Sequence, residues 1–254
     1  MPILGYNNSG NTQTAIINPE TEYSETGYST EDDVRATNWH YAVAGASASG
    51  DSHVVAPKNT FNMYCNREPR FYISVVYNEQ YHWGKGKATN FFFNGEDGQP
   101  SHDNPSAGYL IRKHVDPTFV HSTNTGTYKS RQGILYRLAE AYLSYAESAL
   151  EYSIAKGTYN SEKEDIVKCI NKIRERAGIP QYGASGLGIP TEPEEMRKLI
   201  RRERRVEMNC EGGLRWFDLR RWKEAENVLN GKFYGMNMLA EKDNRDDFYK
   251  RVSY

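Results

Sequence analysis

Two apolar stripes at helical spacing place the strongest constraint on how this chain can fold. The first stripe, in a helix predicted at residues 134–153, consists of Leu135, Leu138, Tyr142, Tyr145, Ala146 and Ala149. The second stripe, in a helix predicted at residues 162–177, consists of Ile166, Cys169, Ile170, Ile173 and Ala177. Gly178 follows directly and supplies a left-handed cap. The pair predicts an antiparallel αα-hairpin of the kind found in a single tetratricopeptide unit.

Two further helices are predicted after this hairpin, at residues 192–211 and 215–229. The first of them starts at TEPE, where Thr191 is the expected N-cap and Glu194 completes a capping box, and it stops at Gly212-Gly213. Its apolar stripe consists of Met196, Leu199, Ile200, Val206 and Cys210. Glu203 and Glu207 interrupt this stripe at positions that also face inward. Their carboxylates therefore need partners.

The stretch from Arg201 to Glu226 is the most charged part of the chain, with eight basic and six acidic residues. A phosphate-binding surface needs uncompensated positive charge, which this stretch lacks. Glu203, Glu207 and Glu211 instead form a ladder at four-residue spacing, and arginine is well suited to pair a partly buried carboxylate. We therefore expect an internal ion-pair network. Trp216 and Trp222, in the same helix-like motif, are expected in the core.

The first half of the chain has no sustained helical period. Residues 1–60 are rich in Asn, Ser, Thr and Gly, which is typical of long loops. Residues 70–77, 90–94 and 108–115 are β-branched or aromatic runs, and they predict strands of a small antiparallel sheet. The expected fold is mainly α with loop-rich irregular segments and a few short β-strands. Residues 1–125 are the expected ligand-facing part and residues 126–254 a helical scaffold, together forming one fold unit.

Composition excludes several classes of function. The formal net charge of -1 gives no overall field that would gather nucleic acid or an anionic membrane. The three cysteines are far apart in sequence, so neither a zinc site nor a disulfide framework is expected, and buried thiols are the simplest interpretation. No apolar run is long enough to span a bilayer, and the first 20 residues do not form a signal peptide.

No catalytic motif can be assembled from these residues. The six histidines show no short metal-binding spacing, and no serine lies in a G-x-S-x-G context. The segment GKGKAT, residues 84–89, lacks the strand and helix that flank a phosphate loop. Paired acids such as Asp32/Asp33 and Asp246/Asp247 are expected to be solvated. We therefore predict a binding protein without catalytic activity, metal or cofactor.

Aromatic residues in polar loops are the candidate ligand contacts. The chain is 13% aromatic with 19 tyrosines, and two short segments, NWHY and EQYHWGKG, combine rings with polar and glycine residues. Flat rings of this kind can stack on the apolar faces of sugars. The candidates are Trp39, His40, Tyr41, Tyr81 and Trp83. The alternative interpretation is that these rings pack beneath the loops.

Several ordered motifs resemble a known family. YRLAEAYLSYAESAL, INKIRERAGIP and IRRERRVEMNCEGGLRWFDLRRWKEAE occur in the order found in the C-terminal part of the SusD/RagB family of bacterial outer-membrane nutrient-binding lipoproteins. Upstream, NREPRFYISVVYN and SAGYLIRKHVDP extend the resemblance to about residues 60–235. The resemblance implies that these motifs are scaffold, with fold-determining residues Arg137, Glu140, Arg174, Arg176, Glu203, Arg204, Glu207, Glu211, Asp218, Arg221 and Trp222.

The resemblance also implies a function and a location. It implies binding of a glycan, as polysaccharide or oligosaccharide, or of another oligomeric nutrient, for delivery to a SusC-like TonB-dependent transporter. The implied location is the extracellular face of the outer membrane, reached through a lipid anchor. Because this sequence has no lipobox and no N-terminal helical hairpins of that family, we expect it to be a fragment of a longer chain. The alternative is a helical-repeat scaffold that binds a peptide or protein partner.

Overall fold

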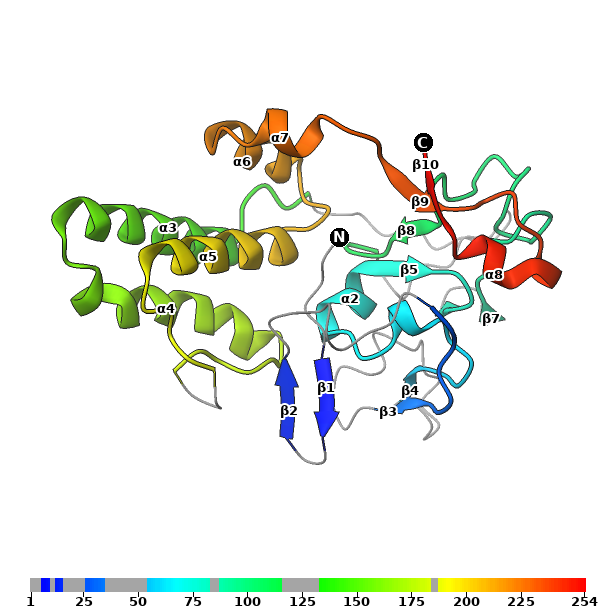
Figure 1. Ribbon diagram of the computed structural model, residues 1–254, viewed down its shortest axis with the longest axis horizontal. Coiled ribbons are helices and arrows are strands. Elements are labelled where there is room, and N and C mark those ends of the chain that lie inside the picture. Colours follow the sequence, from blue (N-terminus) through cyan, green and yellow to red (C-terminus); the bar gives the residue numbers. More distant parts are fainter. Residues whose placement is uncertain are drawn as a thin grey trace. The chain divides into compact units, whose positions relative to one another are not determined.

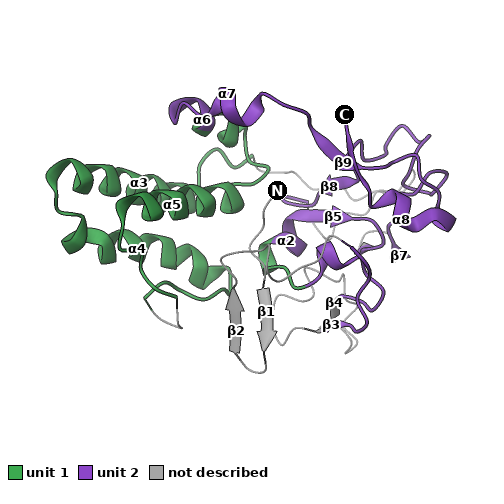
Figure 2. Cartoon of the chain, in the orientation of Figure 1, with its two compact units in different colours: residues 1–22, 66–70, 131–218 green, residues 23–65, 71–130, 219–254 purple. Residues whose placement is uncertain are grey.

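The computed structural model describes residues 6–9, 12–15, 26–34, 54–82, 87–115, 133–183 and 187–254. The chain divides into two compact units, each assembled from several segments (Figure 2). Unit 1 comprises residues 1–22, 66–70 and 131–218, and unit 2 comprises residues 23–65, 71–130 and 219–254. The expected functional division at residue 125 stays a prediction.

Three helices form the body of unit 1 (Figure 1). They are α3 (Leu138–Lys156), α4 (Tyr159–Arg176) and α5 (Pro193–Glu207), which lie side by side. Gly157, with φ of 68°, ends α3 and allows the turn into α4. The apolar core between the three helices includes Leu150, Ile170 and Ile200, all fully buried. The predicted αα-hairpin is therefore confirmed.

The buried face of α3 differs from the predicted stripe. Its buried residues are Leu143, Ala146, Leu150 and Ser153. Leu135 precedes the helix and is 98% exposed, while Leu138 and Tyr145 lie on α3 and are also exposed. The predicted start at residue 134 is wrong, because Arg137 has an extended backbone and is the N-cap. Ala146 of the predicted stripe is buried and Tyr142 and Ala149 pack against the core, so the stripe is right in part. Its other members are exposed because α3 is apolar on two faces, and periodicity does not tell which one packs.

Helix α4 follows its prediction closely. Ile166, Ile170 and Ile173 are buried, and Cys169 packs against the same core. Ala177 is the C-cap and Gly178 has φ of 68°, in the left-handed region. This is the glycine cap that the sequence predicts.

Helix α5 begins and ends differently from the prediction. Its N-cap is Glu192 without a side-chain cap bond, so the predicted capping box at Thr191 is wrong. Pro193 at the first helical position explains the start, since it needs no backbone partner and already has helical φ. The helix ends at Glu207, and Cys210 is exposed with φ of 61°.

The single helix predicted at residues 215–229 is two short helices. They are α6 (Leu214–Arg221) and α7 (Ala225–Leu229), and Lys223 between them has φ of 59°, which no helix can contain. Trp216 is 49% exposed, so its predicted core position is wrong, and Trp222 is half-buried. The eight-residue α6 is too short to bury both rings, and its buried positions are Asp218 and Leu219.

The described strands form five separate antiparallel pairs instead of the predicted single sheet. The pairs are β1 (Tyr6–Ser9) with β2 (Thr12–Ala15), β3 (Asp33–Val34) with β4 (Val54–Ala56), β5 (Val75–Tyr77) with β8 (Tyr109–Ile111), β6 (Tyr81–His82) with β7 (Lys87–Ala88), and β9 (Tyr234–Met236) with β10 (Arg251–Ser253). The remaining helical elements are η2 (Asn62–Tyr64), α2 (Pro69–Ser74), η3 (Lys242–Asn244) and α8 (Arg245–Phe248).

One expected strand is shorter than predicted, and another is not a strand. Residues 70–74 belong to α2, and residues 75–77 form β5. Pro69 is the first residue of α2, a position that proline favours because its backbone needs no hydrogen-bond donor there. Residues 90–94 form a turn in which Phe91 and Phe92 are both fully buried. Consecutive residues of a strand face opposite sides, so two buried neighbours are better explained by a turn beneath a core.

The core of unit 2 is aromatic. Phe61 stacks on Tyr249 with ring centroids 4.1 Å apart, and Tyr64 stacks on Tyr77 at 4.2 Å. Phe92 and Phe248 meet edge to face at 5.0 Å. The high tyrosine content of the chain is thus partly explained by packing in this core.

Candidate functional site

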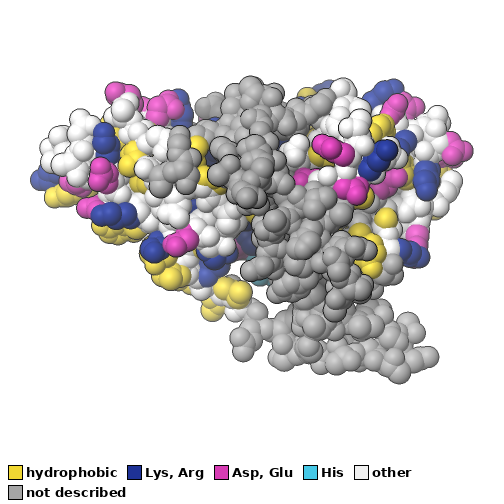
Figure 3. Space-filling model, turned by 90° about the horizontal axis from the view of Figure 1, so that it is seen from below, with side chains coloured by type: hydrophobic (Ala, Val, Ile, Leu, Met, Phe, Trp, Pro, Cys, Tyr) yellow, Lys and Arg dark blue, Asp and Glu magenta, His cyan; other side chains and the backbone are white. Residues whose placement is uncertain are grey.

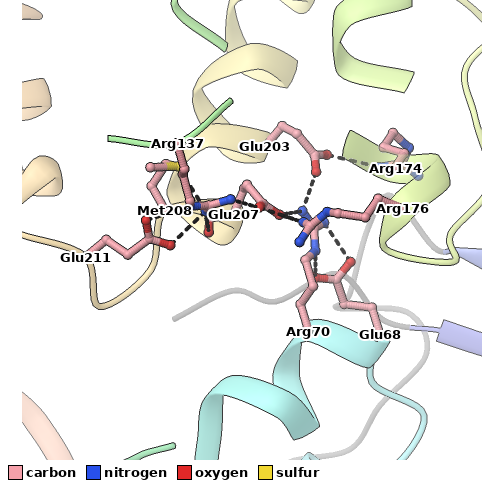
Figure 4. Close-up of polar contacts among 9 residues, drawn as sticks. All are labelled: Glu68, Arg70, Arg137, Arg174, Arg176, Glu203, Glu207, Met208 and Glu211. Carbon is pink, nitrogen blue, oxygen red and sulfur yellow. Dashed lines mark hydrogen bonds and ion pairs between the residues drawn. The ribbon is translucent and has the colours of Figure 1, made fainter. Parts of the chain in front are cut away.

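The two glutamates that interrupt the stripe of α5 lie at the centre of a buried ion-pair network in unit 1 (Figure 4). The side chains of Glu203 and Glu207 are each 2% exposed. The Arg70 guanidinium donates to both carboxylates, at 2.6 Å and 3.0 Å. Arg174, fully buried, donates to Glu203 at 3.1 Å. This is the burial and pairing that the sequence predicts.

Two further arginines complete the partners of Glu207. Arg176 and Arg137 each approach its carboxylate at 2.6 Å. Arg137 also donates to Glu211 at 2.7 Å and to the backbone carbonyl of Glu207 at 2.7 Å. Because the segment before α3 is tied to the end of α5 in this way, the network joins elements about 70 residues apart in the chain.

A second ion pair involves the remaining predicted scaffold residues. Arg204 donates to Asp218 at 2.8 Å and lies 3.7 Å from Glu140, and all three residues belong to unit 1. Arg221 differs, because its guanidinium lies over the ring of Trp222, 4.8 Å from the centroid. The sequence did not identify Glu68 and Arg70 as members. Glu68 is fully buried and holds Arg70 through two bonds, at 2.8 Å and 2.9 Å.

The network keeps the Glu207 carboxylate ionised. Burial by itself raises the pKa of Glu207, but the charges of Arg70, Arg176 and Arg137 outweigh it and hold that pKa below its ordinary value. Burial lowers the pKa of Arg70, but Glu203 and Glu68 raise it further than burial lowers it. Buried groups that neutralise one another are well placed to hold elements together and poorly placed to bind a ligand.

Acid is expected to destabilise the protein through Glu207. Its pKa in the folded state is lower than in the unfolded chain, so its stabilising contribution is present above the unfolded value of about 4.5 and is lost as pH falls below it. Urea denaturation at a series of pH values checks this. The Glu207→Gln variant, which cannot titrate there, is expected to show a shallower loss of stability on acidification than the parent. Equal slopes for the two proteins would show that Glu207 is not ion-paired.

Charged surface residues also argue against a nucleic-acid interface. On the face drawn in Figure 3, basic and acidic side chains are interspersed over the described part of the surface. Exposed cations on the helices pair locally, as Lys168 does with Asp165 and Lys198 with Glu195. A surface that binds phosphates needs clustered, unpaired cations instead.

The β6–β7 hairpin of unit 2 carries the predicted ligand residue that the structure describes. Tyr81 begins β6 opposite Ala88 and is 41% exposed. The root of the hairpin is well held, because Thr89 and Gln80 share a backbone hydrogen bond of 2.9 Å and both are buried. Trp39, His40, Tyr41 and Trp83, the other four candidates, lie outside the described residues.

A polar and aromatic group of unit 2, here called the Arg245 cluster, consists of Tyr28, Glu79, Arg245, Asp246 and Tyr249. Of these residues, Glu79 lies just before the hairpin in the sequence. Arg245 contacts Glu79 at 2.5 Å and lies over the Tyr28 ring, 3.9 Å from its centroid. Tyr28 donates to Asp246 at 2.6 Å, and Tyr249 donates to Glu79 at 3.2 Å. Glu79 thus connects α8 to the residues that begin the hairpin.

The tyrosines of the Arg245 cluster are hydrogen-bond donors at neutral pH. Burial and the bond to Asp246 raise the pKa of Tyr28 well above its ordinary value. Burial and the nearby Glu79 charge do the same for the pKa of Tyr249. Protonated hydroxyls beside a guanidinium and two carboxylates can exchange hydrogen bonds with the hydroxyls of a sugar.

Sequence reasoning missed the Arg245 cluster for a simple reason. Its members come from three segments separated by about 50 and 166 residues, and no spacing within one segment marks them. The acids at 246 and 247 were expected to be solvated. Asp247 is paired only with Lys250, whereas Asp246 accepts the bond from Tyr28. For Arg70 a signal existed, because NREPRFY is one of the motifs that carry the family resemblance.

The described residues contain neither a metal-ligand cluster nor a disulfide. The described residues contain no group of three or more His, Cys, Asp or Glu side chains placed to hold a metal ion. The three cysteines are free thiols. Cys65 is buried as expected, whereas Cys169 is half-buried and Cys210 is exposed.

Comparison with known proteins now decides the family. A family model described as the SusD family matches residues 5–253. The chain belongs to the SusD family. All residues of the Arg/Glu network lie within this matched range. No curated protein matches the chain significantly.

Solved structures agree with this family and with the fold. A protein named BT4246 is 26% identical, with a TM-score of 0.60 over 84% of this chain and 34% of its own. A SusD-like protein from Bacteroides fragilis, BF3747, is 31% identical, with a TM-score of 0.57 over 70% of this chain and 32% of its own. The chain thus spans about a third of the length of these structures. The predicted fold class, mainly helical and SusD-like with short strands, is confirmed.

Proposed function

We propose that this SusD-family chain binds a glycan, or another oligomeric nutrient, at the cell surface and delivers it to a SusC-like TonB-dependent transporter. Membership of the SusD family supports the proposal, and the chain's own surface adds to it. Because the chain spans about a third of the solved structures that it resembles, substrate and partners are proposed for the whole protein of which these residues form a part.

The observation that carries the proposal is the exposed ring of Tyr81, which follows Glu79 of the Arg245 cluster by two residues in the chain. Tyr81 starts a short hairpin that is well held at its root, and the side chain is 41% exposed. Its ring therefore offers a flat apolar face that loses little freedom when a ligand stacks on it. The hydroxyls, guanidinium and carboxylates of the Arg245 cluster can read sugar hydroxyls. Trp83 follows Tyr81 two residues later in the sequence, and with Trp39, His40 and Tyr41 it remains a proposed contributor.

The proposed action is binding without catalysis. In this proposal the charged side chains of the Arg245 cluster act as hydrogen-bonding groups, as the family resemblance implies for a binding protein. Glu79 and Asp246 are engaged by Arg245 and Tyr28. A ligand that exchanges weak hydrogen bonds with such a surface is held reversibly, which suits a protein that hands its ligand to a transporter.

The proposed location is the extracellular face of the outer membrane. None of the helices in the part of the chain that the structure describes is long and apolar enough to cross a bilayer. Attachment through a lipid anchor is the arrangement that the family resemblance implies, and we propose it on that ground.

A helical scaffold that binds a peptide or protein partner is the second candidate, and one observation favours it. Leu138, Tyr145 and Tyr152 lie at seven-residue spacing on α3, and all three are about 60% exposed. An apolar helix face of this kind is suited to receive another helix. The proposed glycan contacts lie in unit 2, whereas the helix face suited to a peptide lies in unit 1.

Affinity electrophoresis against a panel of neutral polysaccharides tests the proposal. Retardation of the parent by at least one polysaccharide, unchanged in Tyr145→Ser, is the expected result, because Tyr145 lies on the helical unit. Two results would favour the scaffold instead. They are absence of retardation by every polysaccharide, or retardation that Tyr145→Ser abolishes while the fold is intact.

A further inference from the structure

The β9–β10 hairpin of unit 2 presents aromatic rings that the core does not use. Phe233, Tyr234 and Tyr254 are 65%, 51% and 58% exposed. Tyr234 lies opposite Ser253 in the ladder, and the backbone N–H of Tyr254 donates to the carbonyl of Phe233 at 2.8 Å. The three rings therefore lie at one end of a two-stranded hairpin, although they are far apart in sequence.

This end of the hairpin is held rigidly. A Cβ on Gly235 would lie 2.7 Å from the Cβ of Ala107, so only glycine lets β9 approach that segment so closely. Gly108 has φ of 85°, and its own Cβ would lie 2.7 Å from the side chain of Met236. The Tyr254 hydroxyl donates to the Met236 carbonyl at 2.6 Å. Rings fixed in this way lose little further freedom when a ligand stacks on them.

Positive charge is concentrated beside these rings. Residues 230–239 and 251–254 contain Lys232 and Arg251 but no Asp or Glu. The guanidinium of Arg251 lies over the Tyr234 ring, 4.2 Å from its centroid. Both Arg251 and Lys232 are exposed, and no carboxylate of the described residues forms an ion pair with either of them. Other exposed cations face an acid, as Lys250 faces Asp247.

We propose that the β9–β10 hairpin is a second carbohydrate-binding platform and that its ligand is an acidic oligosaccharide. Sugar rings stack on Tyr234 and its aromatic neighbours, while a carboxylate or sulfate on the sugar bonds the Arg251 guanidinium, whose planar fork fits such anions. Lys232 adds a second, less directional charge. A neutral glycan forms no ion pair with these two cations, so the platform favours an acidic ligand. This inference rests on the proposed function only in taking the ligand to be a carbohydrate.

The test uses a polyuronate and a polysulfated glycan as two acidic probes and dextran as a neutral one, each titrated into the full chain. Arg251→Gln is expected to weaken binding of an acidic probe about ten-fold and Tyr234→Ala about five-fold. Binding is expected to weaken further as salt is added, because the contact is an exposed ion pair. The two acidic probes report whether carboxylate or sulfate is the preferred group.

Matched controls separate this site from general effects. Lys168→Gln removes an exposed cation from α4, and Tyr152→Ala removes an exposed ring from α3, so neither is expected to change acidic-probe binding. Loss of acidic-probe binding in Arg251→Gln with dextran binding unchanged distinguishes this site from the β6–β7 hairpin, where Tyr81→Ala is expected to weaken binding of a neutral glycan. The proposal is wrong if neither acidic probe binds, if Arg251→Gln weakens dextran binding as much as acidic-probe binding, or if Arg251→Gln and Tyr234→Ala bind the acidic probes like the parent.

Discussion

Replacing Glu207 with alanine is expected to cost about 3 to 5 kcal/mol of the free energy of unfolding. The carboxylate is almost fully buried and contacts three guanidinium groups, those of Arg70, Arg137 and Arg176. Removing it leaves buried positive charge without its partner, which costs more than the pair contributes. Urea denaturation of parent and variant at neutral pH measures the difference.

Glu175→Ala is the matched control for this variant. Glu175 is also a helical glutamate, but its side chain is 58% exposed and its partner Lys172 is 63% exposed. Its loss is expected to change stability by less than about 0.5 kcal/mol. If Glu207→Ala unfolds at the same urea concentration as Glu175→Ala, the buried network does not stabilise this protein.

Replacing Tyr64 with alanine is expected to cost about 3 to 5 kcal/mol and to act on unit 2. Tyr64 is 1% exposed, stacks on Tyr77 at 4.2 Å, and lies edge to face against Phe61 and Tyr249. Truncation opens a cavity among rings that cannot close it without breaking their own stacking. Thermal and urea unfolding report the loss.

Tyr152→Ala serves as the control for Tyr64→Ala, because Tyr152 is 59% exposed and contacts only Lys156 among the described aromatic and cationic partners. The control is expected to stay within about 0.5 kcal/mol of the parent. Similar losses for the two variants would contradict the assignment of Tyr64 to a packed core.

The parts of the fold that sequence predicted are those governed by local periodicity. The stripe of α4 and the inward-facing Glu203 and Glu207 follow from residue spacing alone. The buried face of α3 does not, because its two apolar faces give the same period and tertiary contact chooses between them. Residues 70–74 have strand-like composition, yet α2 forms there, beginning at Pro69 and carrying Arg70 into the buried network.

The candidate site was less predictable than the fold. Tyr81 could be named because it lies in one polar, aromatic segment. The Arg245 cluster could not, since Tyr28, Glu79 and Arg245 meet only after the chain has folded. Likewise, Gly235 lets β9 approach Ala107 closely, while the neighbouring rings of Phe233 and Tyr254 are exposed. Side chains brought together from distant segments leave no periodic signal in a sequence.

The affinity of Tyr81→Ala for the polysaccharide that retards the parent tests the central claim most directly. Titration calorimetry should show the dissociation constant rising about five-fold, because one stacked ring is lost, while the melting temperature stays near that of the parent. Tyr152→Ala, which removes a more exposed tyrosine from the helical unit, should bind like the parent. Unchanged affinity in a folded Tyr81→Ala protein, or an equal loss in Tyr152→Ala, would contradict the claim that the β6–β7 hairpin binds the glycan.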